Sequence, residues 1–261
     1  MNTTAFFSIL LAASTSVASA SFVFQSDFDV TTSDILGIHG IAGDGTNFYL
    51  GSFDSGISVR DASFSETTLY GNPGGFGQIR GVGHDASTGS ILAGNYTTGD
   101  VYRMSTEGVL LDTMNLMGSS LMNAVGADGN SGNIFTLGFN GLIQQHTSTG
   151  AFVSSFNVGT TLTGMAIDDV NQSIFIMTSG DDVVHEYDYN GTLIGTVIAD
   201  GSADGNGQGL YYDNTTGELY VTSQFSMTVW ADSTRQVVPA PASMTLLGLA
   251  CFAAARRRRF S

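Results

Sequence analysis

Five polar residues occupy the same position in a short pattern that recurs along the chain. Each copy ends on an aspartate, with a small residue four positions before it and an aliphatic residue three before it; the aspartates are Asp44, Asp85, Asp128, Asp168 and Asp213. The residues five positions before them are His39, Arg80, Asn123, Thr163 and Gln208. Arranged around an axis, these side chains would form a ring with one cation, one imidazole, three neutral hydrogen-bonding groups and no carboxylate. Such a ring suits a polar neutral or anionic small molecule, such as a sugar or a carboxylate. Alternatively, the positions are polar because they lie in loops, which are solvated.

The recurring aspartates could suggest a metal site or acid–base chemistry, but a structural role is favoured. They stand at the same turn of successive units, so they should lie around the periphery of one face, too far apart to share an ion. The four histidines show no zinc-site spacing; they are His39, His84, His146 and His185. An enzymatic interpretation would therefore rest on His39 and Arg80.

Two acidic loops offer oxygen ligands that calcium could use. One contains Asp200, Asp204 and Asn206, and the other runs from Asp128 to Asn130. Neither matches the twelve-residue calcium loop, which ends in a bidentate glutamate, so ordinary turn chemistry is favoured. The sequence has no Walker-type glycine loop and no nucleophile elbow, and we expect no cofactor.

The spacing of the aspartates predicts the architecture that must position these side chains. They are 41, 43, 40 and 45 residues apart, and a period in the low forties is the length of one four-stranded propeller blade. In the second copy the expected strands are Gly81–His84, Ser90–Gly94, Asp100–Met104 and Val109–Met114, separated by turn residues. We therefore predict an all-β propeller of five blades; six would require a further, degenerate blade.

The fifth copy has no clear outer strand after Trp230, and we expect the N-terminus to supply it. Residues Ser21–Phe28 resemble the outer strands of other copies, so they can complete the last blade and close the ring, which removes open sheet edges. The repeated order of inner strand, aspartate turn and second strand from Phe22 to Trp230 resembles that of the NHL/YncE-like β-propellers. That resemblance implies a fold and leaves the activity open.

The chain is strongly acidic outside its C-terminal end. It has 261 residues, no lysine and a formal net charge of −15. Between Ser21 and Val238 four arginines stand against all 23 acids, a formal charge of −19. Such a surface repels nucleic acid and anionic lipids, tolerates cations and neutral glycans, and keeps a secreted protein soluble. The single cysteine, Cys251, cannot form an intrachain disulfide.

The N-terminal residues 1–20 are typical of a secretory signal peptide. An apolar stretch leads to Ala18-Ser19-Ala20, which predicts cleavage after Ala20. Unlike most signal peptides, this one has no Lys or Arg before its apolar stretch, and a buried N-terminal strand is the alternative. The predicted propeller domain then spans residues 21–237.

Residues 238–261 combine a Pro-x-Pro frame, a short apolar segment and four arginines. The frame is Pro239-Ala240-Pro241, and the arginines are Arg256, Arg257, Arg258 and Arg259. This arrangement resembles the PEP-CTERM sorting signal of Gram-negative bacteria, from which it departs at Ala240, where the motif has glutamate. The resemblance implies export, membrane retention through a helix, processing by an exosortase-type enzyme, and a place at the cell surface or in the exopolysaccharide matrix.

The length of the apolar segment is compatible with a membrane anchor. Ala242–Ala255 would span roughly 21 Å as a helix, against about 30 Å for a bilayer core. Extension to Pro241 and snorkelling arginines make up part of the difference. The arginines would stay cytoplasmic, with the propeller outside. A soluble helix fits poorly, because the segment has no polar face.

These observations predict an exported, surface- or matrix-associated propeller that binds or scaffolds, with exopolysaccharide as a candidate partner, without catalysis. The alternative is a hydrolase or lyase acting on a small polar substrate at the ring of His39 and Arg80. A structural spacer without a ligand is a third interpretation.

Overall fold

The computed structural model describes the repeated body of the chain. The described residues are 21–29, 37–53, 56–70, 78–117, 121–159, 162–179, 183–198, 207–224 and 226–233. The predicted signal peptide, the sorting segment with its helix, and the possible calcium ligands Asp200, Asp204 and Asn206 lie outside them. Within the described part no helix is long and apolar enough to span a membrane.

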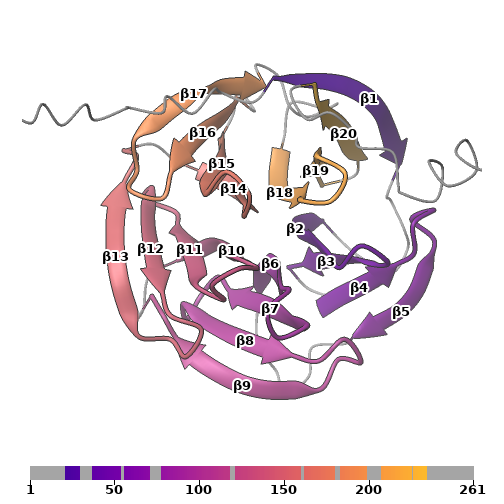
Figure 1. The fold of residues 1–261 in the computed structure, drawn as a ribbon. Helices are drawn as coiled ribbons and strands as arrows, with labels where there is room; N and C mark the ends of the chain where they lie inside the picture. Colours follow the sequence, from indigo (N-terminus) through magenta and orange to yellow (C-terminus); the bar gives the residue numbers. More distant parts are fainter. Residues whose placement is uncertain are drawn as a thin grey trace, which may run out of the picture.

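Twenty strands form five antiparallel sheets of four strands each, arranged around a common axis (Figure 1). Blade one contains β2 (Ile38–Gly43), β3 (Phe48–Ser52), β4 (Gly56–Arg60) and β5 (Glu66–Tyr70). Blade two contains β6 (Ile79–Asp85), β7 (Ser90–Asn95), β8 (Asp100–Met104) and β9 (Leu110–Asn115). Blade three contains β10 (Met122–Ala127), β11 (Ile134–Gly138), β12 (Leu142–His146) and β13 (Phe152–Asn157). Blade four contains β14 (Leu162–Asp168), β15 (Ser173–Thr178), β16 (Val184–Asp188) and β17 (Leu193–Ile198). Blade five contains β18 (Gly207–Asp213), β19 (Glu218–Ser223), β20 (Ser226–Asp232) and, from the N-terminus, β1 (Phe22–Asp29).

The N-terminal strand closes the ring, as predicted. Strand β1 pairs antiparallel with β20, from Phe22 opposite Asp232 to Asp29 opposite Ser226. The pairing continues past both strands, because the Ser233 N–H donates to the Ser21 carbonyl at 2.8 Å. The first and last described segments thus share one sheet, and closure leaves none of the five described blades without its outer strand.

Burial decreases from the axis outward, and the repeated small residue explains how the inner strands meet. All residues of β10 are buried, whereas β13 is mostly exposed. A Cβ on Gly40 would lie 2.5 Å from the Arg80 carbonyl oxygen, and one on Gly81 would lie 2.7 Å from the Ala124 Cα. Neighbouring inner strands therefore approach so closely that these positions have no room for a side chain.

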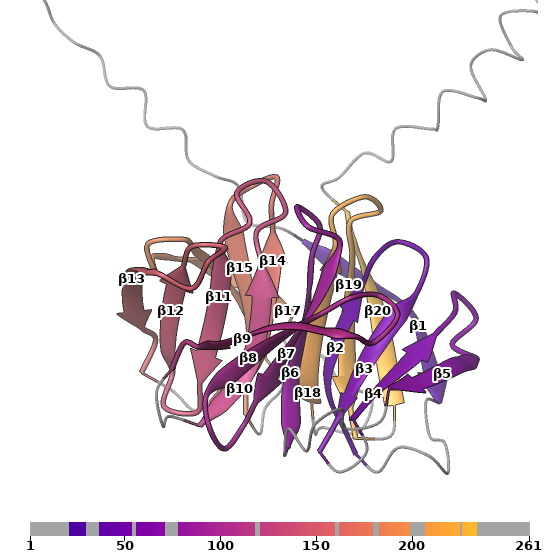
Figure 2. The same cartoon turned by 90° about the horizontal axis from the view of Figure 1, so that it is seen from below.

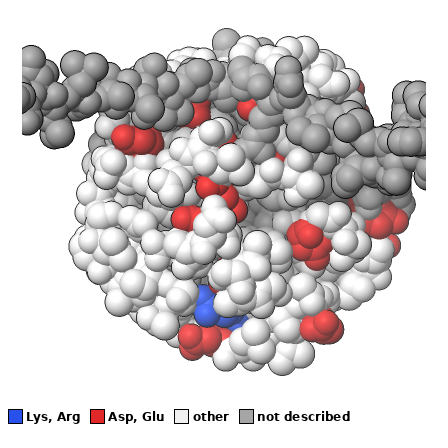
Figure 3. Space-filling view, viewed as in Figure 1, with Lys and Arg blue, Asp and Glu red and all other residues white. Residues whose placement is uncertain are grey.

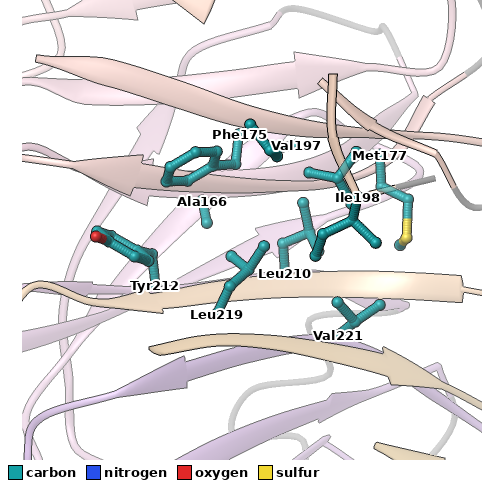
Figure 4. Close-up of a cluster of buried hydrophobic side chains, with 10 residues drawn as sticks. Ala166, Phe175, Met177, Val197, Ile198, Leu210, Tyr212, Leu219 and Val221 are labelled. Carbon is teal, nitrogen blue, oxygen red and sulfur yellow. The ribbon is translucent and has the colours of Figure 1, made fainter. Parts of the chain in front are cut away.

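The hydrophobic core lies between the faces of adjacent blades. Figure 4 shows one cluster, in which Phe175 and Met177 of blade four pack with Leu210, Leu219 and Val221 of blade five. Each such buried side chain stabilises the fold by about 1.5–3 kcal/mol. Figure 2 shows the blades from the side, where strands of successive blades stand next to one another.

The repeated aspartates cap the turns after the inner strands, as their structural interpretation predicted. Asp44 Oδ1 accepts the N–H groups of Thr46 and Asn47 at 2.8 and 2.7 Å. Asp168 Oδ1 accepts those of Val170 and Asn171 in the same way. Because the same turn recurs, the same residue type is required in every blade.

Candidate functional site

The five predicted ring residues occupy one equivalent place in the structure. Each is the second residue of the innermost strand of its blade, at the end where the strand begins; they are His39, Arg80, Asn123, Thr163 and Gln208. In every blade the pairing between the first and second strands shifts at this residue. A bulge of this kind leaves the extra residue outside the ladder and re-aims its side chain. The five bulges therefore present a polar side chain from each blade at one mouth of the central channel, the ring mouth.

Hydrogen bonds join ring residues across blade boundaries. His39 Nδ1 lies 3.0 Å from Gln208 Oε1, which links blades one and five. Arg80 Nη1 donates to Asn123 Oδ1 at 2.8 Å, which links blades two and three. Asn123 Nδ2 in turn donates to the carbonyl of Leu162 in blade four. The structure thus brings His39 to Gln208 and Arg80 to Asn123.

Arg80 is a half-buried cation with neutral partners. Besides Asn123 it contacts the ring of Tyr96, whose centroid lies 4.8 Å from the guanidinium carbon. Burial lowers the pKa of Arg80, since it disfavours the charged form. In the described part of the chain the ion pairs are Arg60–Glu66 at 3.5 Å and Arg103–Asp85 at 3.7 Å. Arg80 has no such carboxylate among these residues.

An aromatic row borders the ring mouth and was not predicted from the sequence. Phe53 lies 5.2 Å from His39 and 5.8 Å from Tyr96, measured between ring centroids. Both aromatic residues directly follow the second strand of their blade, which ends on the side where the first strand begins. The equivalent residue of blade three is Phe139. The sequence does contain a pattern that could have identified this row: three of the five copies have an aromatic residue directly after the second strand.

Thr163 completes the ring without joining the hydrogen-bonded pairs. Its hydroxyl oxygen is buried and has no hydrogen-bond partner within the described part of the chain. A buried hydroxyl without a partner is destabilising unless a ligand or water satisfies it.

The other mouth of the channel has a different chemistry. A cavity of about 180 Å³ there is walled by inner-strand residues of all five blades, and its polar lining includes Asp44, His84, Tyr211 and Asp213. Burial lowers the pKa of His84 even though the Asp44 and Asp85 carboxylates favour its charged form. His146 and His185 lie on the third strands of blades three and four. Among the described residues no three His, Cys, Asp or Glu side chains form a group that could hold a metal ion.

Acidic groups are distributed over the molecule while basic ones are sparse. In Figure 3 acidic side chains lie at separate places over the face shown, whereas basic atoms gather at one place. Within the described residues the basic side chains besides histidine are Arg60, Arg80 and Arg103. Since Arg60 and Arg103 have carboxylate partners, Arg80 is the arginine among these described residues without one.

Comparison with known proteins identifies the fold. No family model matches the sequence, and no curated protein matches it. Among solved structures, the chain is similar to the glutaminyl cyclase of Myxococcus xanthus, with a TM-score of 0.63 and 14% identity. The match covers 80% of this chain and 96% of the other. The chain is a five-bladed β-propeller that shares its fold with that protein, and at this identity the likeness does not extend to activity.

Proposed function

We propose that the protein is an exported, surface- or matrix-associated binding propeller that holds a small carboxylate-bearing molecule, such as an acidic sugar, at the ring mouth. The observation that carries the proposal is Arg80, a half-buried guanidinium whose partners are an amide oxygen and an aromatic face. In a body with a large excess of acids, a desolvated cation without a carboxylate partner in the described residues favours an anionic ligand.

The rest of the ring supports the same class of ligand. Asn123 and Gln208 are buried and hydrogen-bond to Arg80 and His39, so they hold these two side chains in place. The hydroxyl of Thr163, which has no partner among the described residues, can hydrogen-bond to a sugar hydroxyl. Phe53 and Tyr96 add apolar surface beside them. Because Arg80, Thr163 and Phe53 come from three different blades, a ligand on the axis could contact them together.

Export and anchoring rest on the two ends of the chain. The signal-like residues 1–20 and the sorting-like residues 238–261 support transport out of the cytoplasm, with processing by an exosortase-type enzyme. A ligand-binding body delivered to the matrix would contact exopolysaccharide, in which acidic sugars are a chemically suitable partner for Arg80. Nucleic acid is an unsuitable partner because of the negative charge.

A second candidate function is catalysis at the same ring. The similar solved structure is titled a glutaminyl cyclase. At the ring mouth, the imidazole of His39 in blade one is the titratable side chain in the blade next to that of Arg80. A general base must reach the proton that it removes. In the described residues His39 and Arg80 are instead bonded to the neutral amides of Gln208 and Asn123, which favours binding over turnover.

The proposal is tested by calorimetric titration of the purified full-length chain with galacturonate and with galactose. We expect galacturonate to bind, galactose to bind more weakly, and Arg80→Gln to weaken galacturonate binding about tenfold or more. Arg103→Gln is the charge-matched control, because it removes a positive charge that is already paired with Asp85. Equal binding of the two sugars, or equal losses in the two variants, would contradict the proposal. Ammonia release from a glutaminyl peptide would favour the enzymatic alternative.

A further inference from the structure

A second cavity lies at the seam where blades five and one meet. Its volume is about 270 Å³, and strands β1, β3, β18 and β19 contribute to its walls. We call it the seam cavity. Its aromatic and acidic side chains are Phe48, Phe64, Tyr211, Asp213, Glu218 and Tyr220, and its lining includes no Arg or His.

Four aromatic rings form one side of the seam cavity. Tyr211 and Tyr220 stand opposite each other on β18 and β19 and stack with centroids 5.5 Å apart. Phe48 lies 5.0 Å from Tyr220 and 4.4 Å from Phe64. Phe48, Phe64 and Tyr211 remain partly exposed where they pack on the core. The cluster therefore offers ring faces to whatever enters the cavity.

The seam breaks the internal repeat at Tyr211. The residue two before the turn aspartate is small in the other four copies, where it is Ala42, Gly83, Gly126 and Ala166. The tyrosine fits because Gly43 faces it: a Cβ on Gly43 would lie 2.6 Å from Tyr211 Cε1. A large side chain and a facing glycine occur together at the seam, which distinguishes this blade interface from the others.

The backbone of Phe64 is held in an unfavourable conformation. Its φ of 59° lies in the left-handed region, which bulky residues rarely adopt. Arg60 Nη1 donates to the Phe64 carbonyl at 3.1 Å, and the Phe64 N–H donates to the Asp61 carbonyl at 2.9 Å. Strained backbone of this kind clusters at functional sites. Here it directs an aromatic ring into the seam cavity.

Two carboxylates at the seam cavity lack a cationic partner among the described residues. Glu218 Oε2 accepts hydrogen bonds from the Tyr220 hydroxyl at 2.7 Å and from Thr216 Oγ1 at 3.2 Å. Asp213 Oδ1 accepts backbone N–H groups of Thr215 and Thr216. Burial and neighbouring carboxylates raise the pKa of Tyr211 and Tyr220, so both phenols are neutral at pH 7. The negative charge beside the rings thus comes from Glu218 and Asp213.

We propose that the seam cavity binds a small organic cation of the alkylammonium class. Its charge would face Glu218 and Asp213, and its alkyl groups would lie on Phe48, Phe64 and Tyr211. Aromatic faces attract cations through their negative quadrupole, and a quaternary ammonium loses little hydration on entering such a site. The acidic body also raises the local concentration of cations. Uncharged aromatic walls suit an alkylated cation better than a hydrated metal ion.

The test is calorimetric titration of the full-length chain with choline and with its neutral isostere 3,3-dimethyl-1-butanol. We expect choline to bind and the isostere to bind at least about tenfold more weakly, because it lacks the charge that the rings and Glu218 attract. Glu218→Gln should weaken choline binding by about tenfold while keeping the acceptor for Tyr220. The matched control is Glu107→Gln, which changes the net charge equally at an exposed turn of blade two and should change choline binding less than about twofold.

A second variant keeps the proposal testable if Glu218→Gln does not fold. Tyr211→Ala introduces alanine, which two of the other copies have at this position (Ala42 and Ala166), and it should abolish choline binding. No measurable choline binding, equal binding of the isostere, or equal losses in Glu218→Gln and Glu107→Gln would overturn the proposal. Arg80→Gln should leave choline binding unchanged, so failure of the ring-mouth proposal and failure of this one are distinguishable.

Discussion

The two ends of the inner strands differ in how far the five copies of the repeat agree in residue type. At the turn end the residue is aspartate in all five copies, and Asp44 and Asp168 each bond to N–H groups of their own turns. At the ring mouth the five residues are all different, and Arg80 and Asn123 bond across blade boundaries. A position whose side chain serves its own backbone is restricted to one residue type. At a bulge the side chain is not needed to hold the local backbone, so the residue type can differ from blade to blade and can determine which ligand binds.

The largest expected effect comes from changing the small residue that lies between the two ends. In Gly81→Ala the new Cβ would meet the Ala124 Cα at 2.7 Å and the Val125 nitrogen at 2.7 Å. We expect a loss of about 3–4 kcal/mol in the free energy of unfolding, because backbone must move. Urea unfolding measures it. The control Gly89→Ala has open space around it but a φ of 66°, and it should lose only about 1 kcal/mol; equal losses would refute close strand approach as the cause.

The next effect tests the structural role of the turn end. Asp85 is fully buried and accepts hydrogen bonds from Ser87 and Thr88, with Arg103 at 3.7 Å. Asp85→Ala should cost about 3 kcal/mol, since it leaves these donors unsatisfied. Asp112→Ala, at an exposed position of β9, should cost about 0.5 kcal/mol or less. Thermal unfolding of both variants decides the matter, and a mild effect of Asp85→Ala would contradict the structural role.

Acid should weaken the turn end in two stages. Burial holds the pKa of His84 below its ordinary 6.5, so the unfolded chain takes up this proton first and stability declines as pH falls below about 6.5. Partial burial of Asp44 is outweighed by hydrogen bonds from Tyr49, Asn47 and Thr46, so the pKa of Asp44 lies below 3.8. The contribution of Asp44 to the free energy of unfolding is complete above its unfolded-state pKa of 3.8. It is lost as pH falls through the lower pKa of the folded state.

The pH dependence is measured by urea unfolding midpoints between pH 7.5 and 3. His84→Gln should flatten the decline that begins near pH 6.5, and Asp44→Asn should flatten the one below pH 4. A midpoint that rises on acidification from pH 7 to pH 5, or a His84→Gln profile identical to that of the unmodified chain, would show that His84 does not drive the first stage.

The smallest expected effect on stability is at the ring mouth. Thr163→Val removes a buried hydroxyl that has no partner among the described residues. It should change stability by less than about 1 kcal/mol, in the stabilising direction, while weakening galacturonate binding. Thermal unfolding with and without galacturonate separates the two effects. A strongly destabilised variant would place Thr163 with the structural residues of the turn end.

Much of the fold could be predicted because the residue types of the repeat determine the local backbone conformation. The aspartate turns, the glycines and the apolar strands follow from short-range chemistry, and the strand order within a blade follows from them. The completion of blade five by the N-terminal strand was also predictable, because a strand was missing at one end and present at the other. The ring residues could be aligned from the same register.

What the sequence by itself determined is therefore the blade, the blade number and the list of polar residues at the ring. The tertiary structure decided which of these side chains contact one another. Arg80 and Asn123 are 43 positions apart in the sequence, and they contact each other only because two blades pack together. The same is true of Phe53 beside Tyr96, and of the seam cavity, where Gly43 and Tyr211 come from opposite ends of the chain. The physical reason is that local turn and strand preferences act over a few residues, whereas a site on the axis or at the seam exists only after the ring has closed.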